Sequence, residues 1–162
     1  MKRSTCDRLF VTSRDVDCAV IPPSAVMHQQ EADHQMAGAI ASEVASQQEV
    51  FSFLTDPATH GGRAVQRIDT HAASVFLAGD HAFKVKRAVR YPYLDFSTLA
   101  KRKAALEVEL EVNRAFAPQI YTGVVPIIRR PDGALAIGGD GAPVEWALRM
   151  RRFDETDRKS VG

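Results

Sequence analysis

The stretch that decides the fold is SVFLAGDHAFKVKRAV, residues 74–89. Two short apolar runs flank the turn Ala78-Gly79-Asp80, a pattern typical of a tight β-hairpin. Lys84 and Lys86 stand inside the second run. An ammonium group is costly to bury unless it is paired, so strand interiors usually avoid lysine. These two lysines therefore need either solvent or a counter-charge.

The segments before this hairpin predict another strand and a short helix. The run AVQRIDT, residues 64–70, alternates with a period of two and is typical of a strand. In SQQEVFSFLTDP, the apolar side chains of Val50, Phe51 and Leu54 fall on one side of a short helix, which Pro57 and Gly61-Gly62 end. Residues 1–45 lack sustained periodicity, and we interpret them as a loosely structured extension with a frayed helix near 35–45.

The clearest helix follows the hairpin, at about residues 98–116. Asp95 or Ser97 is suited to cap it, and Pro118 stops it. Its apolar stripe consists of Leu99, Leu106 and Leu110. We assign its charged side chains to solvated faces; these are Lys101, Arg102, Lys103, Glu107 and Glu111.

Further strands follow this helix, in VVPIIRR (124–130), ALAIGG (134–139) and PVEWALRMRRF (143–153). In the last of these, four apolar residues alternate with a second set, as in a half-buried strand. The apolar set is Val144, Trp146, Leu148 and Met150, and the other set is Glu145, Ala147, Arg149 and Arg151. The predicted fold is therefore α+β, an antiparallel sheet of about five or six strands with one long helix packed on it.

The composition is that of an ordinary globular domain. The 162 residues carry a net charge of +1, which gives no bulk attraction to nucleic acid or membranes. Cys6 and Cys18 form neither a disulfide framework nor a metal-ligand set, so a reducing cytoplasm fits best. We find no apolar run long enough for a membrane span and no convincing export signal.

Alternation within the lysine-bearing strand puts Ala82, Lys84 and Lys86 on one face. The long helix offers Glu107, Glu109 and Glu111 as counter-charges. In kinase-type phosphoryl transfer, a strand lysine contacts the α- and β-phosphates of the nucleotide, and a helix glutamate holds that lysine.

Three segments together resemble the aminoglycoside-phosphotransferase family. They are RIDTHAASVFLAGDHAFKVKRAVRYPYLDFSTL (67–99), EVELEVNRAFAPQIYTGVVPI (107–127) and PVEWALRMRRF (143–153). The most similar subgroup is one often fused to a P-loop ATP-binding domain. The resemblance covers about residues 47–154 and implies the N-terminal lobe of a protein-kinase-like fold that binds ATP. It divides the chain into an extension (1–45), this lobe (46–154) and a tail (155–162) with no counterpart in the family, which we expect to be disordered or artefactual.

The resemblance also assigns roles to residues. Lys84, in Ala82-Phe83-Lys84-Val85, is the first choice for the phosphate-contacting lysine, and Lys86 is the second. Glu109, followed by Leu110 and Ala117-Pro118, is preferred over Glu107 as the glutamate that holds Lys84. On this assignment Lys86 is solvated, and the backbone after Phe153 meets the adenine.

The loop over the phosphates has no glycine and reads Thr70-His71-Ala72-Ala73-Ser74. Its backbone amides and the hydroxyl of Ser74 or Thr70 remain candidates to face a phosphate. We interpret His71 as a turn or packing residue.

From residue 47 onward, where the resemblance begins, the sequence contains no H-x-D catalytic loop and no D-x-D or D-F-G motif. We therefore expect a truncated lobe that does not transfer phosphate by itself. Magnesium and a C-terminal lobe are expected only in an intact relative.

Three alternatives stay open. The lysines and glutamates are solvated surface residues in the first. The second is a small nucleic-acid-binding β domain, with Tyr91 and Tyr93 as stacking groups beside a basic cluster of Lys84, Lys86, Arg87 and Arg90. In the third, the lobe is a non-catalytic module that binds a nucleotide or docks on a partner.

Overall fold

The computed structural model describes residues 23–152, and the chain divides into two compact units, 1–34 and 35–162. Cys6, Cys18, Phe153 and the tail 155–162 lie outside the described residues. Helix α1 (Pro23–Thr55) begins in the first unit and ends in the second. The other elements, all in the second unit, are η1 (Pro57–His60), β1 (Val65–Asp69), β2 (Ala73–Ala78), β3 (His81–Lys86), β4 (Arg90–Tyr91), β5 (Leu94–Asp95), α2 (Leu99–Arg114), β6 (Tyr121–Arg129), β7 (Leu135–Ile137) and β8 (Pro143–Arg151).

Six of the strands form one antiparallel sheet with the order β1-β2-β3-β8-β6-β7. The predicted hairpin is confirmed, since Ala78 pairs with His81 across the turn and Gly79 has the positive φ of 54° that the turn requires. β8, the last strand, lies between β3 and β6, so the lysine-bearing strand is in the interior of the sheet. The α+β class and the antiparallel sheet are confirmed.

The C-terminal part of α1 covers one face of this sheet. Val50, Phe51 and Leu54 are buried, as their spacing predicts, and they belong to the main apolar cluster. The rest of that cluster comes from the sheet and consists of Phe76, Phe83, Val85, Ile127 and Ala147. Burial of these side chains supplies the main apolar driving force for this layer.

α1 is much longer than the short helix that we predicted. We expected residues 1–45 to be a loose extension with a frayed helix near 35–45; a helix is present there, but it covers all the described residues 23–45 and is continuous with the packed segment. Pro23 is the first helical residue, where its missing N–H costs nothing. No further proline occurs before Pro57, and Gly38 is the one glycine in between, so nothing in the sequence stops the helix.

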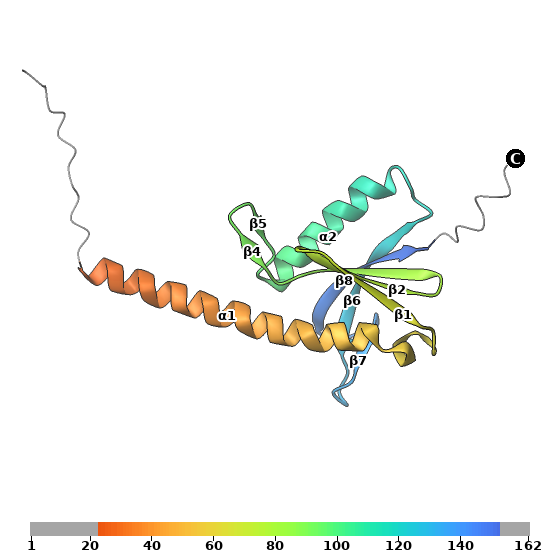
Figure 1. The fold of residues 1–162 in the computed structure, drawn as a ribbon, viewed down its shortest axis with the longest axis horizontal. Coiled ribbons are helices and arrows are strands. Elements are labelled where there is room, and N and C mark those ends of the chain that lie inside the picture. The colour runs from red at the N-terminus through yellow and green to blue at the C-terminus, as the bar shows by residue number, and fades with distance from the viewer. Residues whose placement is uncertain (1–22, 153–162) are drawn as a thin grey trace, which may run out of the picture. The chain divides into compact units, whose positions relative to one another are not determined.

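α2 covers the opposite face of the sheet, so the expectation of a single packed helix is wrong (Figure 1). Because both faces are covered, β8 is not simply half-buried. Glu145 and Ala147, which we expected to alternate outward, are completely buried, as is Leu148 on the other face.

The start of α2 also differs from the prediction. Thr98 is the N-cap, and its side chain accepts a hydrogen bond from the backbone N–H of Lys101. Asp95 instead accepts hydrogen bonds from the backbone and hydroxyl of Ser97 and from the Lys101 ammonium. These bonds order the turn that precedes the cap and hold the pKa of Asp95 well below its usual range.

Within residues 23–152, no helix has both the length and the apolar character that crossing a bilayer requires.

Candidate functional site

Two lysines of β3 share one carboxylate of α2. Lys84 Nζ lies 2.5 Å from Glu109 Oε1, and Lys86 Nζ lies 2.7 Å from Glu109 Oε2. The predicted pairing of Lys84 with Glu109 is confirmed. The prediction that Lys86 is solvated is wrong, because its side chain is only 13% exposed and is held by the same carboxylate.

The local sequence explains this arrangement. Residues 84 and 86 project to the same face of β3, the face that α2 covers. Lys86 also lies 5.4 Å from the ring centre of Phe96, which adds a cation–π contact. The Asn113 side chain donates to the Glu109 backbone carbonyl one turn away, at 2.7 Å.

The electrostatics of this cluster favour an anion. Burial by itself would raise the pKa of Glu109, but the hydrogen bonds from Lys84 and Lys86 outweigh it and lower the pKa below 4.5. Glu109 is therefore charged at neutral pH, and two ammonium groups around one carboxylate leave one positive charge in excess. The Lys84 side chain is 27% exposed, about twice as much as that of Lys86, so Lys84 is the more accessible cation.

Ser74 does not join this cluster. It pairs with Val85 across the β2–β3 ladder, so its side chain lies on the face of the sheet opposite to Lys84. The side chain is fully buried, and its hydroxyl donates to Asp69 Oδ1 at 2.6 Å. Thr70 bonds to the backbone of Ala73 within its own loop. We therefore leave both hydroxyls out of the candidate site.

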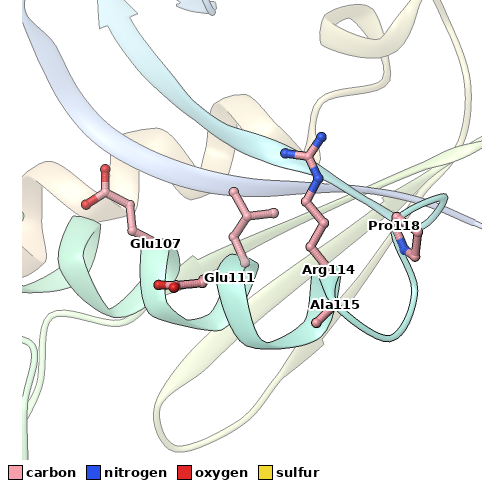
Figure 2. Close-up of a pocket in the computed structure, with 6 residues that line it drawn as sticks. Glu107, Glu111, Arg114, Ala115 and Pro118 are labelled. Carbon is pink, nitrogen blue, oxygen red and sulfur yellow. The ribbon is translucent and has the colours of Figure 1, made fainter.

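The other helix glutamates are also placed apart from the lysines. Glu107 pairs with Lys103 on the exposed side of α2 at 3.4 Å. Glu107 and Glu111 line an open groove of about 610 Å³ at the end of α2, together with Arg114 and Pro118. Figure 2 shows these side chains following one another along α2 toward Pro118. Neither β3 lysine lines this groove.

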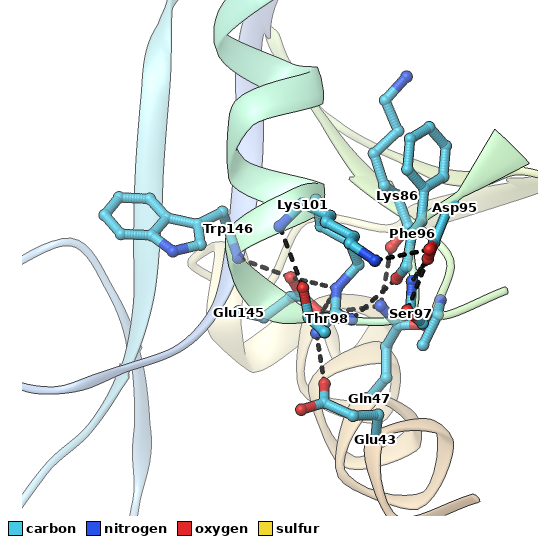
Figure 3. A network of polar contacts seen from close by, with 12 residues as sticks. Glu43, Gln47, Lys86, Asp95, Phe96, Ser97, Thr98, Lys101, Glu145 and Trp146 are labelled. Carbon is cyan, nitrogen blue, oxygen red and sulfur yellow. Dashed lines mark hydrogen bonds and ion pairs between the residues drawn. The ribbon is translucent and has the colours of Figure 1, made fainter. Parts of the chain in front are cut away.

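Sequence reasoning missed a second polar cluster, centred on Arg102. This residue, assigned to a solvated face, is 1% exposed. Its Nε donates to both carboxylate oxygens of Glu145, at 3.0 and 3.1 Å, and Glu145 is 0% exposed. Its other nitrogens donate to the Phe96 carbonyl at 3.1 Å and to Glu43 Oε2 at 2.7 Å. Figure 3 shows Glu43, Glu145 and Phe96, the residues that these bonds reach, in one network of polar contacts.

Gln47 of α1 completes this second cluster at the point where β3 and β8 stop pairing. The β3–β8 ladder ends at the pair Lys84–Leu148. Beyond it, the Gln47 amide donates to the Lys86 carbonyl and to Glu145 Oε2, both at 2.7 Å, and accepts from the Ala88 N–H at 2.8 Å (Figure 3). Burial raises the pKa of Glu145 further than Arg102 lowers it.

A sequence signal for this second cluster exists. Arg102 lies four residues before Leu106, so both share one face of α2, and that face is the apolar one. Glu145 is the one acidic residue in the otherwise apolar run Pro143–Leu148. Pairing the two requires knowing that helix and strand meet, which no local pattern contains.

The described residues 23–152 include no group of three or more His, Cys, Asp and Glu side chains placed to hold a metal ion.

Three curated relatives are similar to this chain: an uncharacterized protein of Mycobacterium bovis and uncharacterized proteins of two strains of Mycobacterium tuberculosis. Each is 37% identical over 90 residues. The match covers 56% of this chain but 16% of each relative, so it spans about one sixth of their length. No family model and no solved structure matches the chain.

Proposed function

We propose that this chain carries the N-terminal lobe of a kinase-like phosphotransferase of the aminoglycoside-phosphotransferase type, and that Lys84 contacts the phosphates of ATP. The observation that carries the proposal is the Lys84–Glu109 ion pair between a central strand and the helix covering it. Kinase-type enzymes use a strand lysine and a helix glutamate in these roles. In an intact relative the reaction is transfer of the γ-phosphoryl group to a hydroxyl.

The donor set fits a phosphate group. The cluster has an excess positive charge, and a phosphate oxygen is the kind of acceptor that an ammonium group binds most strongly. Lys84 retains donors beyond the one that contacts Glu109, because an ammonium group has three. Lys86 is the less exposed of the two, and we assign it to holding Glu109 rather than the ligand.

Titration calorimetry with Mg-ATP on the full chain tests this function. The Lys84→Met variant removes the proposed phosphate contact, and we expect it to weaken binding about tenfold or more, as for loss of a charge-assisted hydrogen bond. Lys103→Met is the matched control, because it removes an equally charged side chain that contacts Glu107 and Trp146 instead. Equal loss in both variants, or no binding by the unmodified chain, contradicts the proposal.

A second candidate, a single-stranded nucleic-acid module, is favoured by one observation. Tyr91 and Tyr93 of the β4–β5 hairpin stack with their ring centres 5.7 Å apart and 11° between ring planes, and Tyr93 is 75% exposed. Exposed stacked rings beside Arg90 suit an unpaired base. Retention of the chain by an oligonucleotide, with a steep salt dependence that Tyr93→Ser abolishes, would favour this candidate over ATP binding.

A further inference from the structure

We propose that Glu43 of α1 is a positioning residue for the Lys84–Glu109 site and that it acts through Arg102, while Gln47 of the same helix holds the lysine-bearing strand directly. This proposal rests on the proposed function for its biological meaning. Its physical content is that α1, on one face of the sheet, sets the placement of α2 on the other.

The first step is that α1 contacts both partners of the site. Through Gln47 it bonds to the Lys86 carbonyl and the Ala88 N–H, which belong to the lysine-bearing strand and the residues after it. Through Glu43 it bonds to Arg102 of α2, the helix that carries Glu109. These side chains, one turn apart on α1, therefore connect the two elements whose spacing decides whether Lys84 reaches Glu109.

The second step is that Arg102 fixes α2 in rotation and along its axis. Its guanidinium makes bonds in three directions, to Glu145 of β8, to the Phe96 carbonyl and to Glu43. A planar guanidinium held on several sides has one allowed placement, and a side chain 1% exposed has little room to change rotamer.

The third step is geometric. Arg102 and Glu109 are seven residues apart, about two helical turns, so both side chains leave α2 on the side that faces the sheet. A rotation or slide of α2 that releases Arg102 also carries Glu109 away from the lysines. The position of Glu109 relative to the lysines therefore depends on the bonds that hold Arg102.

The decisive measurement is the pKa of the Glu109 carboxyl, read by side-chain carbon NMR on the full chain without nucleotide and assigned by comparison with Glu109→Gln. The test variant is Glu43→Gln, at a side chain that is 37% exposed and whose loss leaves the Arg102–Glu145 pair in place. Glu49→Gln is the matched control, because Glu49 lies on the same helix and pairs with an arginine, but that arginine is Arg129 of β6.

The sign of the shift separates positioning from a direct charge effect. Removing a negative charge in the vicinity lowers the pKa of a carboxyl, whereas separating Glu109 from Lys84 and Lys86 raises it. We expect a rise of about half a unit to one unit in Glu43→Gln and no change in Glu49→Gln. Arg102→Lys, which keeps the charge but not the fork of donors, is expected to raise it as well.

Three results overturn the proposal: an unchanged or lowered Glu109 pKa in Glu43→Gln, an equal rise in Glu49→Gln, or an unchanged pKa in Arg102→Lys. A Mg-ATP titration of the same samples judges the proposed function separately. If the unmodified chain binds no ATP, the proposed function fails while the pKa values still decide whether Glu43 positions Glu109.

Discussion

Two ion-paired clusters connect α2 with the sheet, and they differ in burial and in charge balance. Around Glu109, two lysines share one carboxylate in a half-open site and leave a positive charge in excess. Around Arg102, one arginine is shared by Glu145 and Glu43 in a site where the guanidinium and Glu145 are sealed from water. Among the described residues every fully buried side-chain nitrogen and oxygen, those of the second cluster included, has a hydrogen-bond partner, whereas the Lys84 ammonium of the first cluster is partly exposed to solvent. A helix can thus carry a buried and a half-exposed ion pair on the same side.

The substitution that should cost the most stability is Arg102→Met, and its cost tests whether the Arg102 cluster is the structural one. The substitution leaves Glu145 buried without its charge partner, and we expect a loss of about 3–5 kcal/mol of unfolding free energy, measured by urea denaturation. The double variant Arg102→Met/Glu145→Leu should recover much of this loss, because no buried charge remains. A single-variant cost below about 1 kcal/mol would mean that the cluster is not the structural one.

Glu109→Gln should cost less, about 1 kcal/mol, because the two lysines that it leaves are partly hydrated. The same urea experiment measures it. A cost as large as that of Arg102→Met would remove the distinction between a sealed and a half-open cluster.

The contributions of Glu109 and Glu145 to the stability of the folded chain should change with pH in opposite directions. The pKa of Glu109 is lowered in the folded chain, so its contribution is fully present above 4.5 and is lost as the pH falls through the folded value. The pKa of Glu145 is raised, so the folded chain retains a proton that the unfolded chain has lost above 4.5. Its contribution is therefore greatest at low pH and declines as the pH rises through the folded value.

Urea denaturation at a series of pH values checks these signs. In the unmodified chain, stability should fall as the pH drops through the folded pKa of Glu109, and Glu109→Gln should make this fall smaller. Stability should also fall as the pH rises through the folded pKa of Glu145, and Glu145→Gln should make that fall smaller. The same pH profile in both variants would show that the two carboxylates do not differ in the way described.

The smallest effect is expected for Glu49→Gln. Its pair with Arg129 is well formed, with an oxygen–nitrogen distance of 2.6 Å, but both side chains are about half exposed and hydrated. The urea midpoint should remain within the scatter of replicate measurements, because exposed ion pairs contribute little. A midpoint shift comparable to that of Glu109→Gln would show that exposure does not rank these pairs.

The sequence predicts those features that local patterns determine. The hairpin at Gly79 follows from two apolar runs around a turn, and the common face of Lys84 and Lys86 follows from strand alternation. The preference for Glu109 as the partner of Lys84 came from the family resemblance, and the observed pair agrees with it. The resemblance itself remains a proposal.

The features that were missed depend on contacts between elements distant in the chain. Arg102 and Glu145 are 43 residues apart, and although each lies on or in an apolar part of its own segment, no local pattern indicates that the two meet. Lys86 was expected to be solvated because one glutamate was assigned to one lysine, while a carboxylate has two oxygens and accepts from both. Ser74 was judged by its place in a loop, but its register with Val85 puts it on the other face.

The measurement that tests the central claim most directly is a Mg-ATP titration of lysine-labelled full chain, followed through the ammonium nitrogen signals of Lys84, Lys86 and Lys103. Our account predicts that the Lys84 signal shifts in a saturable manner, that the Lys86 signal keeps the position of an ion pair with Glu109, and that the Lys103 signal does not move. If ATP shifts no lysine signal, or shifts Lys103 as much as Lys84, then Lys84 is not a phosphate-binding residue and the proposed function is wrong.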